Sequence, residues 1–365
     1  MEKVHIDSVV IGGGIVGQSV AAELSKKFSC VLLEKNARLI EETSSRNSGV
    51  VHSGVYYPNS SAKNKYCILG KEKLYEYCKD KDVNVRKTGK YIVSSKSNIN
   101  KFEDLIKKCI EKNIPHEEIS IVELKKIYPS IQSDYVLHIK DSGIVDVHDL
   151  SRSLEQDFLR NNGSIQLGAW AKKVFKKGNR FEVLVEMQNE SYIIETNILI
   201  FSLGLRTPEF FKAQDELDIE KYLIPMKFYI GHYYKCKNFD NFKHLIYPIP
   251  EKNSLGIHIC FNLYDNYITF GPDAELIEYP DISLNKFGED LEEKFYSAIS
   301  SYIPSIRDYH INPDYVGIRP KIESQDFQII DESTHNHKNC IVLNGIESPG
   351  LTSSIAIGQE IANRF

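Results

Sequence analysis

The sequence predicts an α/β (α+β) protein in which a Rossmann-like domain is interrupted by an antiparallel β-sheet. Three observations lead to this prediction. A strand–turn–helix–strand pattern opens the 365-residue chain, a second strand–turn–helix pattern closes it, and a strand-rich stretch with many aromatic residues lies between them. Because a chain of this length is longer than one hydrophobic core usually accommodates, we expect two domains.

The opening pattern is a β-α-β unit. The apolar run Val4–Ile11 predicts a buried strand, a helix follows through about Lys27, and Cys30–Leu33 predicts a second strand that ends in Glu34. The turn between the first strand and the helix has the pattern Gly12-x-Gly14-x-x-Gly17. An acidic residue about 20 positions after such a turn completes the fingerprint of a dinucleotide site.

Each residue of this fingerprint has a physical task. Gly12 permits the tight turn, Gly14 lets the backbone approach a diphosphate, and Gly17 allows close packing of the helix. Glu34 accepts hydrogen bonds from ribose hydroxyls and repels a 2′-phosphate. The free N–H groups at the start of the helix attract phosphate oxygens. The neighbouring residues expected to contact the cofactor are Ile15, Val16 and Lys35.

The closing pattern identifies the nucleotide as FAD. Cys340–Leu343 predicts a strand and Thr352–Ala362 a helix, whose N-terminus can stabilise negative charge on the pyrimidine ring of a flavin. We find no second nucleotide fingerprint, which argues against NAD(P)H as electron partner. Oxygen, a quinone or another electron carrier must then reoxidise the flavin. The glycine-rich contacts expected at this end are Gly204, Gly345, Gly350, Leu351 and Thr352.

The middle of the chain supplies the second domain. The stretch from about Ile224 to Phe270 alternates apolar and polar residues and predicts an antiparallel sheet. Further strands are expected at Tyr91–Ser94, Ser164–Leu167, Phe181–Glu186, Tyr192–Thr196 and Ile198–Ser202, and helices at Lys63–Lys79, Lys101–Lys112, Val122–Ile127, Ser151–Asn162 and Leu291–Tyr302. We expect residues 1–85, 140–215 and 312–365 to form a discontinuous FAD-binding domain, and residues 86–139 and 216–311 a substrate-binding domain.

Composition excludes several classes of protein. The formal net charge is −5 and charges of both signs are dispersed, so a nucleic-acid-binding surface is not expected. The seven cysteines include no CxxC pair, which argues against a disulfide framework and against a zinc site. No apolar run is long enough to span a bilayer. We therefore expect a cytoplasmic protein, with peripheral contact at the inner face of the membrane as an alternative.

Several segments together resemble one family. They are residues 43–58, 245–250, 255–258, 270–273, 317–321 and 345–352. In order and over nearly the whole chain, they are similar to the L-2-hydroxyglutarate dehydrogenases and oxidases, which are D-amino-acid-oxidase-like FAD-dependent oxidoreductases. Three positions depart from the family pattern: Ser53 replaces Ala, Leu203 replaces Ala and Tyr279 replaces Trp.

The resemblance implies oxidation of a small L-2-hydroxy acid to the 2-oxo acid by hydride transfer to FAD. It also implies that the backbone of Val174 binds adenine. The loop that follows the ribose-binding acid is expected to contact the diphosphate or the flavin through Ser45, Arg46, Asn47 and Ser48.

The substrate must be held by its carboxylate and must lose its hydroxyl proton. Arg319 is the expected carboxylate ligand because a guanidinium offers two parallel donors, and Lys321 either assists it or holds a second carboxylate. A surface ion pair is the alternative for Arg319. His52 is the expected proton acceptor, although covalent attachment to the flavin or simple packing in the loop remain open. Expected wall residues are Tyr56, Tyr57, Tyr247 and His258; His232 and His244 are expected in the core or at the rim.

Other functions remain open on the sequence alone. An amine or amino-acid oxidase, or a sugar-acid or glycerol-phosphate oxidoreductase, would use the same fold, although phosphate calls for more cationic groups than Arg319 and Lys321. A non-catalytic dinucleotide-binding sensor would keep the glycine turn but would not need His52 and Arg319 in one cavity.

Overall fold

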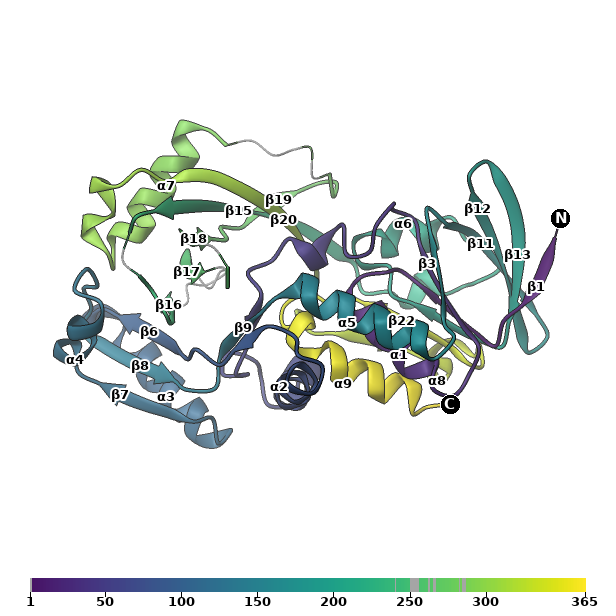
Figure 1. Cartoon of the computed structure of the whole chain (residues 1–365), viewed down its shortest axis with the longest axis horizontal. Helices are drawn as coiled ribbons and strands as arrows, with labels where there is room; N and C mark the ends of the chain where they lie inside the picture. Colours follow the sequence, from purple (N-terminus) through teal and green to yellow (C-terminus); the bar gives the residue numbers. More distant parts are fainter. Residues whose placement is uncertain are drawn as a thin grey trace.

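The computed structural model describes residues 2–239, 241–249, 256–261, 263–264, 267–281, 283 and 287–365. Figure 1 shows two lobes. One lobe, on the right, holds both chain ends and a six-stranded sheet, and the other, on the left, holds a nine-stranded sheet. Among the described helices, none is both long and apolar enough to cross a bilayer.

The six-stranded sheet has the order β10-β3-β2-β14-β22-β21. Its strands are β2 (Ser8–Ile11), β3 (Cys30–Glu34), β10 (Ser164–Leu167), β14 (Ile198–Phe201), β21 (Gln328–Ile330) and β22 (Cys340–Asn344). All neighbours are parallel except β21 and β22. The four central strands are buried along their whole length, as expected of parallel strands covered on both faces.

The prediction of a single strand over Val4–Ile11 is wrong. The segment forms β1 (Lys3–His5), which pairs with β13 in another sheet, and β2. The chain changes sheets at Asp7, whose carboxylate accepts hydrogen bonds from Ser29 and whose carbonyl accepts from Ile198 N. β1 is exposed on both faces, so burial does not hold it in line with β2.

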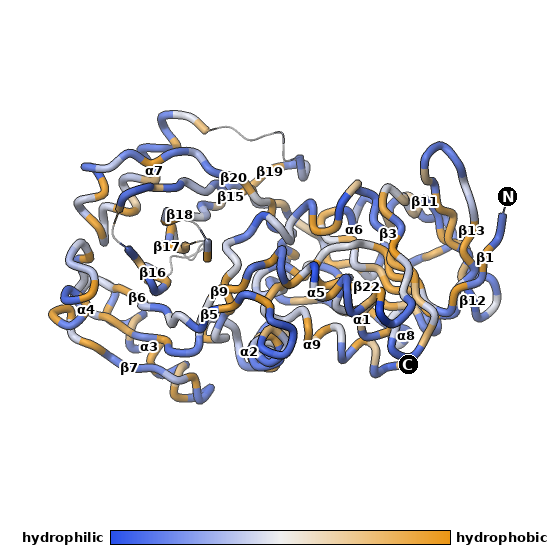
Figure 2. Tube along the Cα trace, viewed as in Figure 1, coloured by the Kyte–Doolittle hydropathy of each residue, from blue (hydrophilic) through white to orange (hydrophobic). Residues whose placement is uncertain are grey.

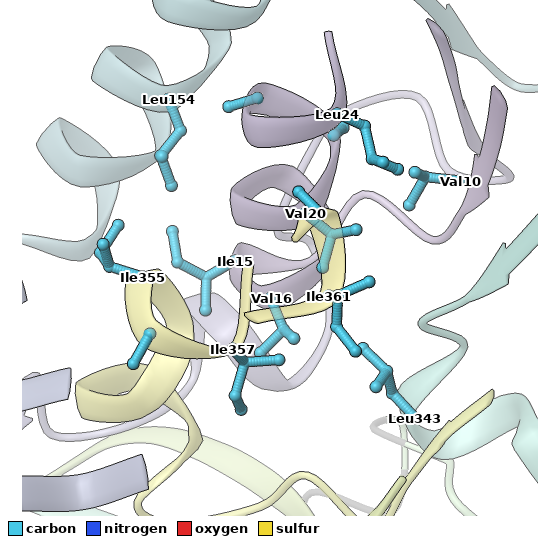
Figure 3. Close-up of a cluster of buried hydrophobic side chains, with 14 of the residues drawn as sticks. Val10, Ile15, Val16, Val20, Leu24, Leu154, Leu343, Ile355, Ile357 and Ile361 are labelled. Carbon is cyan, nitrogen blue, oxygen red and sulfur yellow. The ribbon is translucent and has the colours of Figure 1, made fainter. Parts of the chain in front are cut away.

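Helices cover the six-stranded sheet. They are α1 (Ile15–Leu24), α2 (Ala62–Asp80), α5 (Val147–Arg160) and α9 (Gly350–Ala362). Their apolar side chains interlock with those of the strands, and Figure 3 shows part of this core. Figure 2 shows hydrophobic residues gathered around α1 and β22, while α2 is largely hydrophilic. The helices predicted at residues 63–79, 151–162 and 352–362 are confirmed within a few residues, and α1 ends three residues before Lys27.

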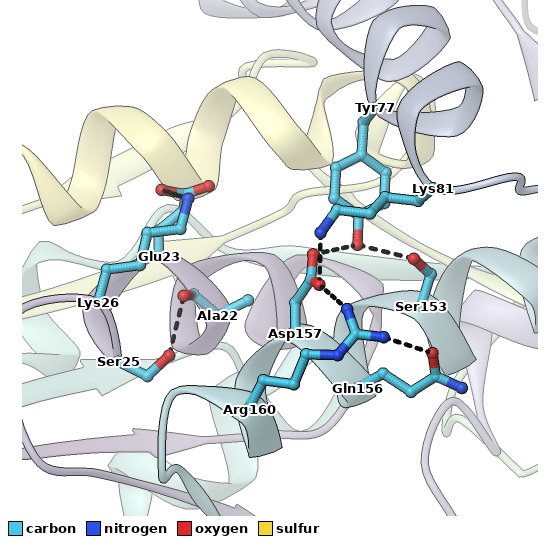
Figure 4. A network of polar contacts seen from close by, with 10 residues as sticks. All are labelled: Ala22, Glu23, Ser25, Lys26, Tyr77, Lys81, Ser153, Gln156, Asp157 and Arg160. Carbon is cyan, nitrogen blue, oxygen red and sulfur yellow. Dashed lines mark hydrogen bonds and ion pairs between the residues drawn. The ribbon is translucent and has the colours of Figure 1, made fainter.

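Polar contacts also join α2 to α5. Asp157 accepts hydrogen bonds from Lys81 Nζ at 2.6 Å and from the Tyr77 hydroxyl at 3.0 Å, and Tyr77 also lies 3.0 Å from the Ser153 hydroxyl (Figure 4). Arg160 of α5 donates to the same carboxylate at 3.1 Å. The five side chains fix the relative position of the two helices at their outer ends.

Close packing of α9 depends on glycines. A Cβ at Gly358 would lie 2.6 Å from the carbonyl oxygen of Ser19 in α1, and a Cβ at Gly70 of α2 would lie 2.4 Å from the carbonyl oxygen of Thr352. The first approach holds α9 against α1, and the second holds the N-terminal turn of α9 against α2.

We expect Gly358→Ala to destabilise the fold. The added methyl group has no room between α1 and α9, and overpacking of this kind costs about 1–3 kcal/mol. Thermal unfolding followed by circular dichroism measures the effect. Gly288→Ala is the control, since a Cβ there meets nothing within 4 Å. An unchanged melting temperature for Gly358→Ala would contradict the close packing.

Two smaller sheets complete this lobe. A four-stranded sheet has the order β1-β13-β12-β11, with β11 (Trp170–Lys177), β12 (Arg180–Met187) and β13 (Glu190–Thr196). A three-stranded sheet pairs β9 (Gly143–Val145) with β4 (Val50–Val51) and β5 (Val85–Arg86). Short helices lie at η1 (Thr43–Ser45), η3 (Gly204–Arg206), α6 (Thr207–Lys212), η4 (Glu220–Tyr222) and α8 (Glu332–His335).

The second lobe is built on the nine-stranded sheet. Its order is β19-β15-β18-β17-β16-β6-β8-β7, with β20 also paired to β15. The strands are β6 (Lys90–Ser94), β7 (His116–Ile119), β8 (Tyr135–Ile139), β15 (Met226–Lys237), β16 (Leu245–Pro248), β17 (His258–Phe261), β18 (Tyr267–Gly271), β19 (Glu275–Ile277) and β20 (Asn312–Ile322). Its helices are η2 (Lys96–Asn98), α3 (Ile99–Glu111), α4 (Ile121–Ile127), α7 (Glu289–Ser300) and η6 (Pro304–Asp308).

The expected antiparallel pairing over residues 224–270 is confirmed for β15, β16, β17 and β18, but β16 also pairs in parallel with β6. Pro250 and Leu255, which belong to the family-like segments, lie outside the described residues. The division into two domains stays a prediction. Its boundary at residue 312 does not coincide with the edge of a sheet, because β20 pairs along β15.

Candidate active site

Two adjoining cavities lie at the carboxyl ends of the parallel strands. The larger has a volume of about 600 Å³ and runs from β3 to the start of β11. The smaller lies between the N-termini of α1 and α9 and the nine-stranded sheet. They share the lining residues Gly14, Thr43, Ser44, Ser202 and Gly204. This is the place where open α/β sheets bind ligands.

The glycine turn shapes the floor of both cavities. Gly12 has a φ of 111°, and a Cβ there would lie 2.1 Å from the carbonyl oxygen of Ser202. A Cβ at Gly17 would lie 1.9 Å from the carbonyl oxygen of Gly12. Any side chain at either position would push α1 away from the strands. Gly14, Ile15 and Val16 line the smaller cavity.

Glu34 lies at the edge of the larger cavity. Its carboxylate accepts hydrogen bonds from the backbone N–H groups of Gly13 and Asn36, both at 2.8 Å. Burial raises the pKa of Glu34, and the two hydrogen bonds oppose this rise. Lys35 also lines the cavity and pairs with Glu42 at 2.8 Å.

Val174 does not line the larger cavity. Its side chain lies in the core, and its N–H donates to the Gln214 side chain at 2.9 Å. The wall is formed instead by Ala169, Trp170, Ala171 and Lys172 at the start of β11. A register irregularity in β11 between Ala171 and Lys173 separates these positions from Val174. The chain's only tryptophan therefore borders this cavity, at a position that no motif marks.

The loop after Glu34 contributes different residues from some of those expected. Asn47 and Ser48 line the smaller cavity, but Ser45 and Arg46 do not. The Ser45 hydroxyl donates to the Glu42 carbonyl at 3.4 Å, and Arg46 donates to the Val316 carbonyl at 3.4 Å. Ser44, not singled out from the sequence, lines both cavities, and its hydroxyl accepts from Ile15 N at 3.0 Å. The helical turn η1 sets which residues face inward.

The C-terminal turn closes the smaller cavity. Gly350 and Leu351 line it, while Gly345, with a φ of 66°, packs against Ile322. Thr352, the next residue, does not line the cavity. Its hydroxyl accepts from His52 N at 3.0 Å and donates to the Val50 carbonyl at 3.3 Å. Thr352 thereby ties the start of α9 to the loop that carries His52.

Four of the residues expected in catalysis meet in the smaller cavity. They are His52, Tyr247, His258 and Arg319. They come from the loop after β4 and from strands β16, β17 and β20, so only the folded sheet brings them together. Tyr57 and Lys321 do not line the cavity. Tyr57 hydrogen-bonds Ser348, and Lys321 Nζ lies 5.7 Å from the centroid of the Tyr229 ring.

His52 is a neutral imidazole at physiological pH. Burial lowers its pKa well below the usual value, and the charges of Lys90 and Arg319 lower it further. Nε2 lies 3.2 Å from the Ser348 hydroxyl, whereas Nδ1 is buried without a hydrogen-bond partner in the described structure. A neutral imidazole with an unused nitrogen is able to accept a proton.

His258 is fixed in one tautomer. Its Nδ1 lies 3.1 Å from the carbonyl oxygen of Gly256, so Nδ1 carries the hydrogen and Nε2 is an acceptor. Nε2 is buried and has no partner among the described residues. The ring stacks on Tyr247 with centroids 3.9 Å apart, and burial lowers the pKa of His258 to about 3.

Arg319 is the accessible cation of the smaller cavity. Its side chain is 42% exposed, and Nη1 lies 3.4 Å from the carboxylate of Glu347, which is only 4% exposed. Glu347 also pairs with the buried Lys63. One carboxylate is therefore shared between two cations, and Arg319 retains donors for a ligand.

Two residues of the site, one in the cavity wall and one behind it, are not marked by any sequence motif. Tyr233 lines the cavity and stacks on Tyr315 at 4.3 Å, and Lys90 is buried directly behind Tyr247. His232 and His244 lie elsewhere. The former pairs with Asp273 at 2.9 Å and the latter with the Tyr128 hydroxyl at 2.7 Å, so both have structural partners.

Comparison with known proteins identifies the family. A family model described as "FAD dependent oxidoreductase" matches residues 7–364. The chain belongs to this family. It is 35% identical over 408 residues to the mitochondrial L-2-hydroxyglutarate dehydrogenase of Arabidopsis thaliana, a match that covers 100% of this chain and 84% of the relative. The resemblance to this group of FAD-dependent oxidoreductases is thus confirmed.

More distant members of the FAD dependent oxidoreductase family agree. L-2-hydroxyglutarate dehydrogenase of Escherichia coli (strain K12) is 25% identical, with 98% of this chain and 92% of the relative covered. The solved structure of L-alpha-glycerophosphate oxidase from Mycoplasma pneumoniae with FAD bound has a TM-score of 0.86 and 24% identity, covering 99% of this chain and 94% of that one. This last likeness supports the fold.

The predicted cofactor, FAD, is confirmed, and the cavities fit it. Glu34 offers ribose hydroxyls an acceptor, and Gly14, at the start of α1 and without a side chain, lines both cavities. The start of α9 lies at the other end. As an FAD dependent oxidoreductase, the chain is an enzyme that transfers electrons from a substrate to this cofactor.

Proposed function

We propose that this enzyme oxidises an L-2-hydroxy acid with a second carboxylate, of the L-2-hydroxyglutarate type, to the 2-oxo acid. The observation that carries the proposal is the meeting of an accessible guanidinium, Arg319, with a neutral imidazole, His52, in one cavity at the N-terminus of α9. The names of the relatives, L-2-hydroxyglutarate dehydrogenases, support the choice of substrate.

The residues divide the reaction between them. Arg319 binds the carboxylate next to the reacting carbon, and Tyr247 and His258 form the wall that excludes water. FAD supplies the acceptor for the hydride that leaves the α-carbon with two electrons. His52 takes the hydroxyl proton, so the C–O single bond becomes a carbonyl and the charges balance. Ser348, 3.2 Å from His52 Nε2, holds the imidazole in place.

The contacts to FAD are also proposed from the cavities. Glu34 and Lys35 bind the adenosine side, Gly12 and Gly14 the diphosphate, and Ser48, Gly350 and Leu351 the flavin side. Oxygen, a quinone or another carrier reoxidises the flavin. We propose a cytoplasmic location because all seven cysteines are free and buried thiols, with peripheral membrane contact as the alternative.

Anaerobic bleaching tests the proposal. We expect the purified yellow protein to lose its flavin absorbance with L-2-hydroxyglutarate but not with D-2-hydroxyglutarate, glycine or glycerol 3-phosphate. The glycine and glycerol 3-phosphate arms test the amino-acid oxidase and glycerol-phosphate alternatives. A yellow protein that no 2-hydroxy acid bleaches would refute the proposed substrate class.

A further inference from the structure

Lys90 is a buried cation that the reaction described above does not use. The residue is 0% exposed and lies at the start of β6. Its Nζ has no hydrogen-bond partner in the described structure, and no described carboxylate lies within ion-pair distance of it. An ammonium group buried in this way is costly, so its retention calls for an explanation.

The ammonium lies directly behind the wall of the smaller cavity. Nζ is 4.7 Å from the ring centroid of Tyr56 and 4.7 Å from that of Tyr247. Tyr247 faces the cavity and stacks on His258. The two aromatic faces stabilise the cation where water is absent. They do not neutralise it, and the positive field extends through Tyr247 into the cavity.

The sheet order separates this cation from Arg319. Arg319 belongs to β20, which pairs with β15, and Lys90 belongs to β6, which pairs with β16. Strands β15, β17 and β16, which carry Tyr233, His258 and Tyr247, lie between them. Arg319 has a partial partner in Glu347, whereas Asp141, the acid that interacts with Lys90 through space, pairs with Lys71. Positive charge thus remains at both ends of the cavity wall.

We propose that Lys90 is a specificity-determining residue that favours substrates with a second, distal carboxylate while Arg319 holds the first. This proposal rests on the proposed function and deepens it. Lys90 acts through space across the Tyr247 ring, without contacting the substrate. At separations of about 7–12 Å and an effective dielectric constant of about 20, such a charge is worth about 10- to 50-fold in affinity.

Lys90 is charged at neutral pH but loses its charge at slightly higher pH. Burial lowers its pKa to about 8. The ionisable groups that interact with it from the other elements are His52, Tyr56, Cys67, Cys109, Asp141, Tyr247, His258 and Cys260. Burial raises the pKa of each of these thiols and phenols and lowers the pKa of both imidazoles, so none of them changes charge near pH 8.

The experiment compares two five-carbon substrates, L-2-hydroxyglutarate and L-2-hydroxyvalerate, in anaerobic flavin reduction. For Lys90→Met holoenzyme we expect kcat/KM for L-2-hydroxyglutarate to fall about 10- to 50-fold, mainly through KM, with that for L-2-hydroxyvalerate changed less than about 3-fold. For the wild type, we expect kcat/KM for L-2-hydroxyglutarate, but not that for L-2-hydroxyvalerate, to fall as pH rises through about 8, because Lys90 loses its charge there. That second measurement needs no variant.

Equal losses for both substrates in Lys90→Met, or identical wild-type pH profiles above pH 7, would overturn the role of Lys90 and leave the proposed function intact. A wild type that bleaches with L-2-hydroxyvalerate but not with L-2-hydroxyglutarate also overturns it. Failure of the wild type with both substrates overturns the proposed function, and this inference falls with it.

Discussion

Replacing His52 with Asn is expected to lower kcat/KM for the 2-hydroxy acid by about 10²- to 10⁴-fold, the usual contribution of a positioned general base. Asn keeps a polar side chain that is able to hydrogen-bond Ser348, but it cannot accept the hydroxyl proton. FAD content is expected to remain near that of the wild type, because the His52 backbone N–H, which bonds Thr352, is retained.

The pH profile separates a base from a packed loop residue. Because the folded pKa of His52 lies well below 6.5, the acidic limb of wild-type kcat/KM lies below that pH, and activity is lost only as pH falls through the lowered value. In His52→Asn this limb disappears. His148→Asn, which changes an exposed histidine on α5, is the control.

Two outcomes would remove His52 from the role of base. One is a variant whose kcat/KM stays within about 3-fold of the wild type. The other is flavin that remains attached to the wild-type chain after denaturation and is released from the variant, which would assign His52 to covalent attachment instead.

The parts of the site that local sterics dictate were predictable from the sequence. The positive φ of Gly12 and the contact between Gly17 and the Gly12 carbonyl are properties of one strand–turn–helix unit, so the spacing of the glycines is enough to find them. His52, in the loop after β4, and Arg319, on β20, lie far apart in the sequence. Their meeting was implied by the family resemblance and not by any local pattern.

Long-range packing explains what the sequence did not reveal. Lys90 precedes the apolar run Tyr91–Val93 and has the pattern of a strand-edge lysine, yet β16 and the Tyr56 loop cover it completely. The turn η1 orients Ser44, and not Ser45, toward the cavities. A register irregularity in β11 places Trp170, and not Val174, at the larger cavity. No periodicity or motif in a single sequence predicts these three placements.

Arg319→Met is expected to lower kcat/KM by about 10²- to 10³-fold and to act mainly on KM. The substrate carboxylate would lose two charge-assisted hydrogen bonds, and a hydrogen bond to a charged group contributes about 1.5–3 kcal/mol. Glu347 would keep Lys63 as its partner, so the C-terminal turn should retain its shape. Flavin absorbance and thermal stability are expected to stay close to those of the wild type.

The matched control is Arg307→Met, which removes an exposed arginine whose ion pair with Glu293 lies on α7 and η6, away from the cavity. Arg319→Lys discriminates further. It keeps the charge but loses the bidentate geometry, so partial recovery of KM relative to Arg319→Met is expected. A wild-type KM for Arg319→Met, in a variant whose flavin is still bleached by substrate, would contradict this role. Arg319 would then only form an ion pair with Glu347, and another group of the cavity would bind the substrate carboxylate.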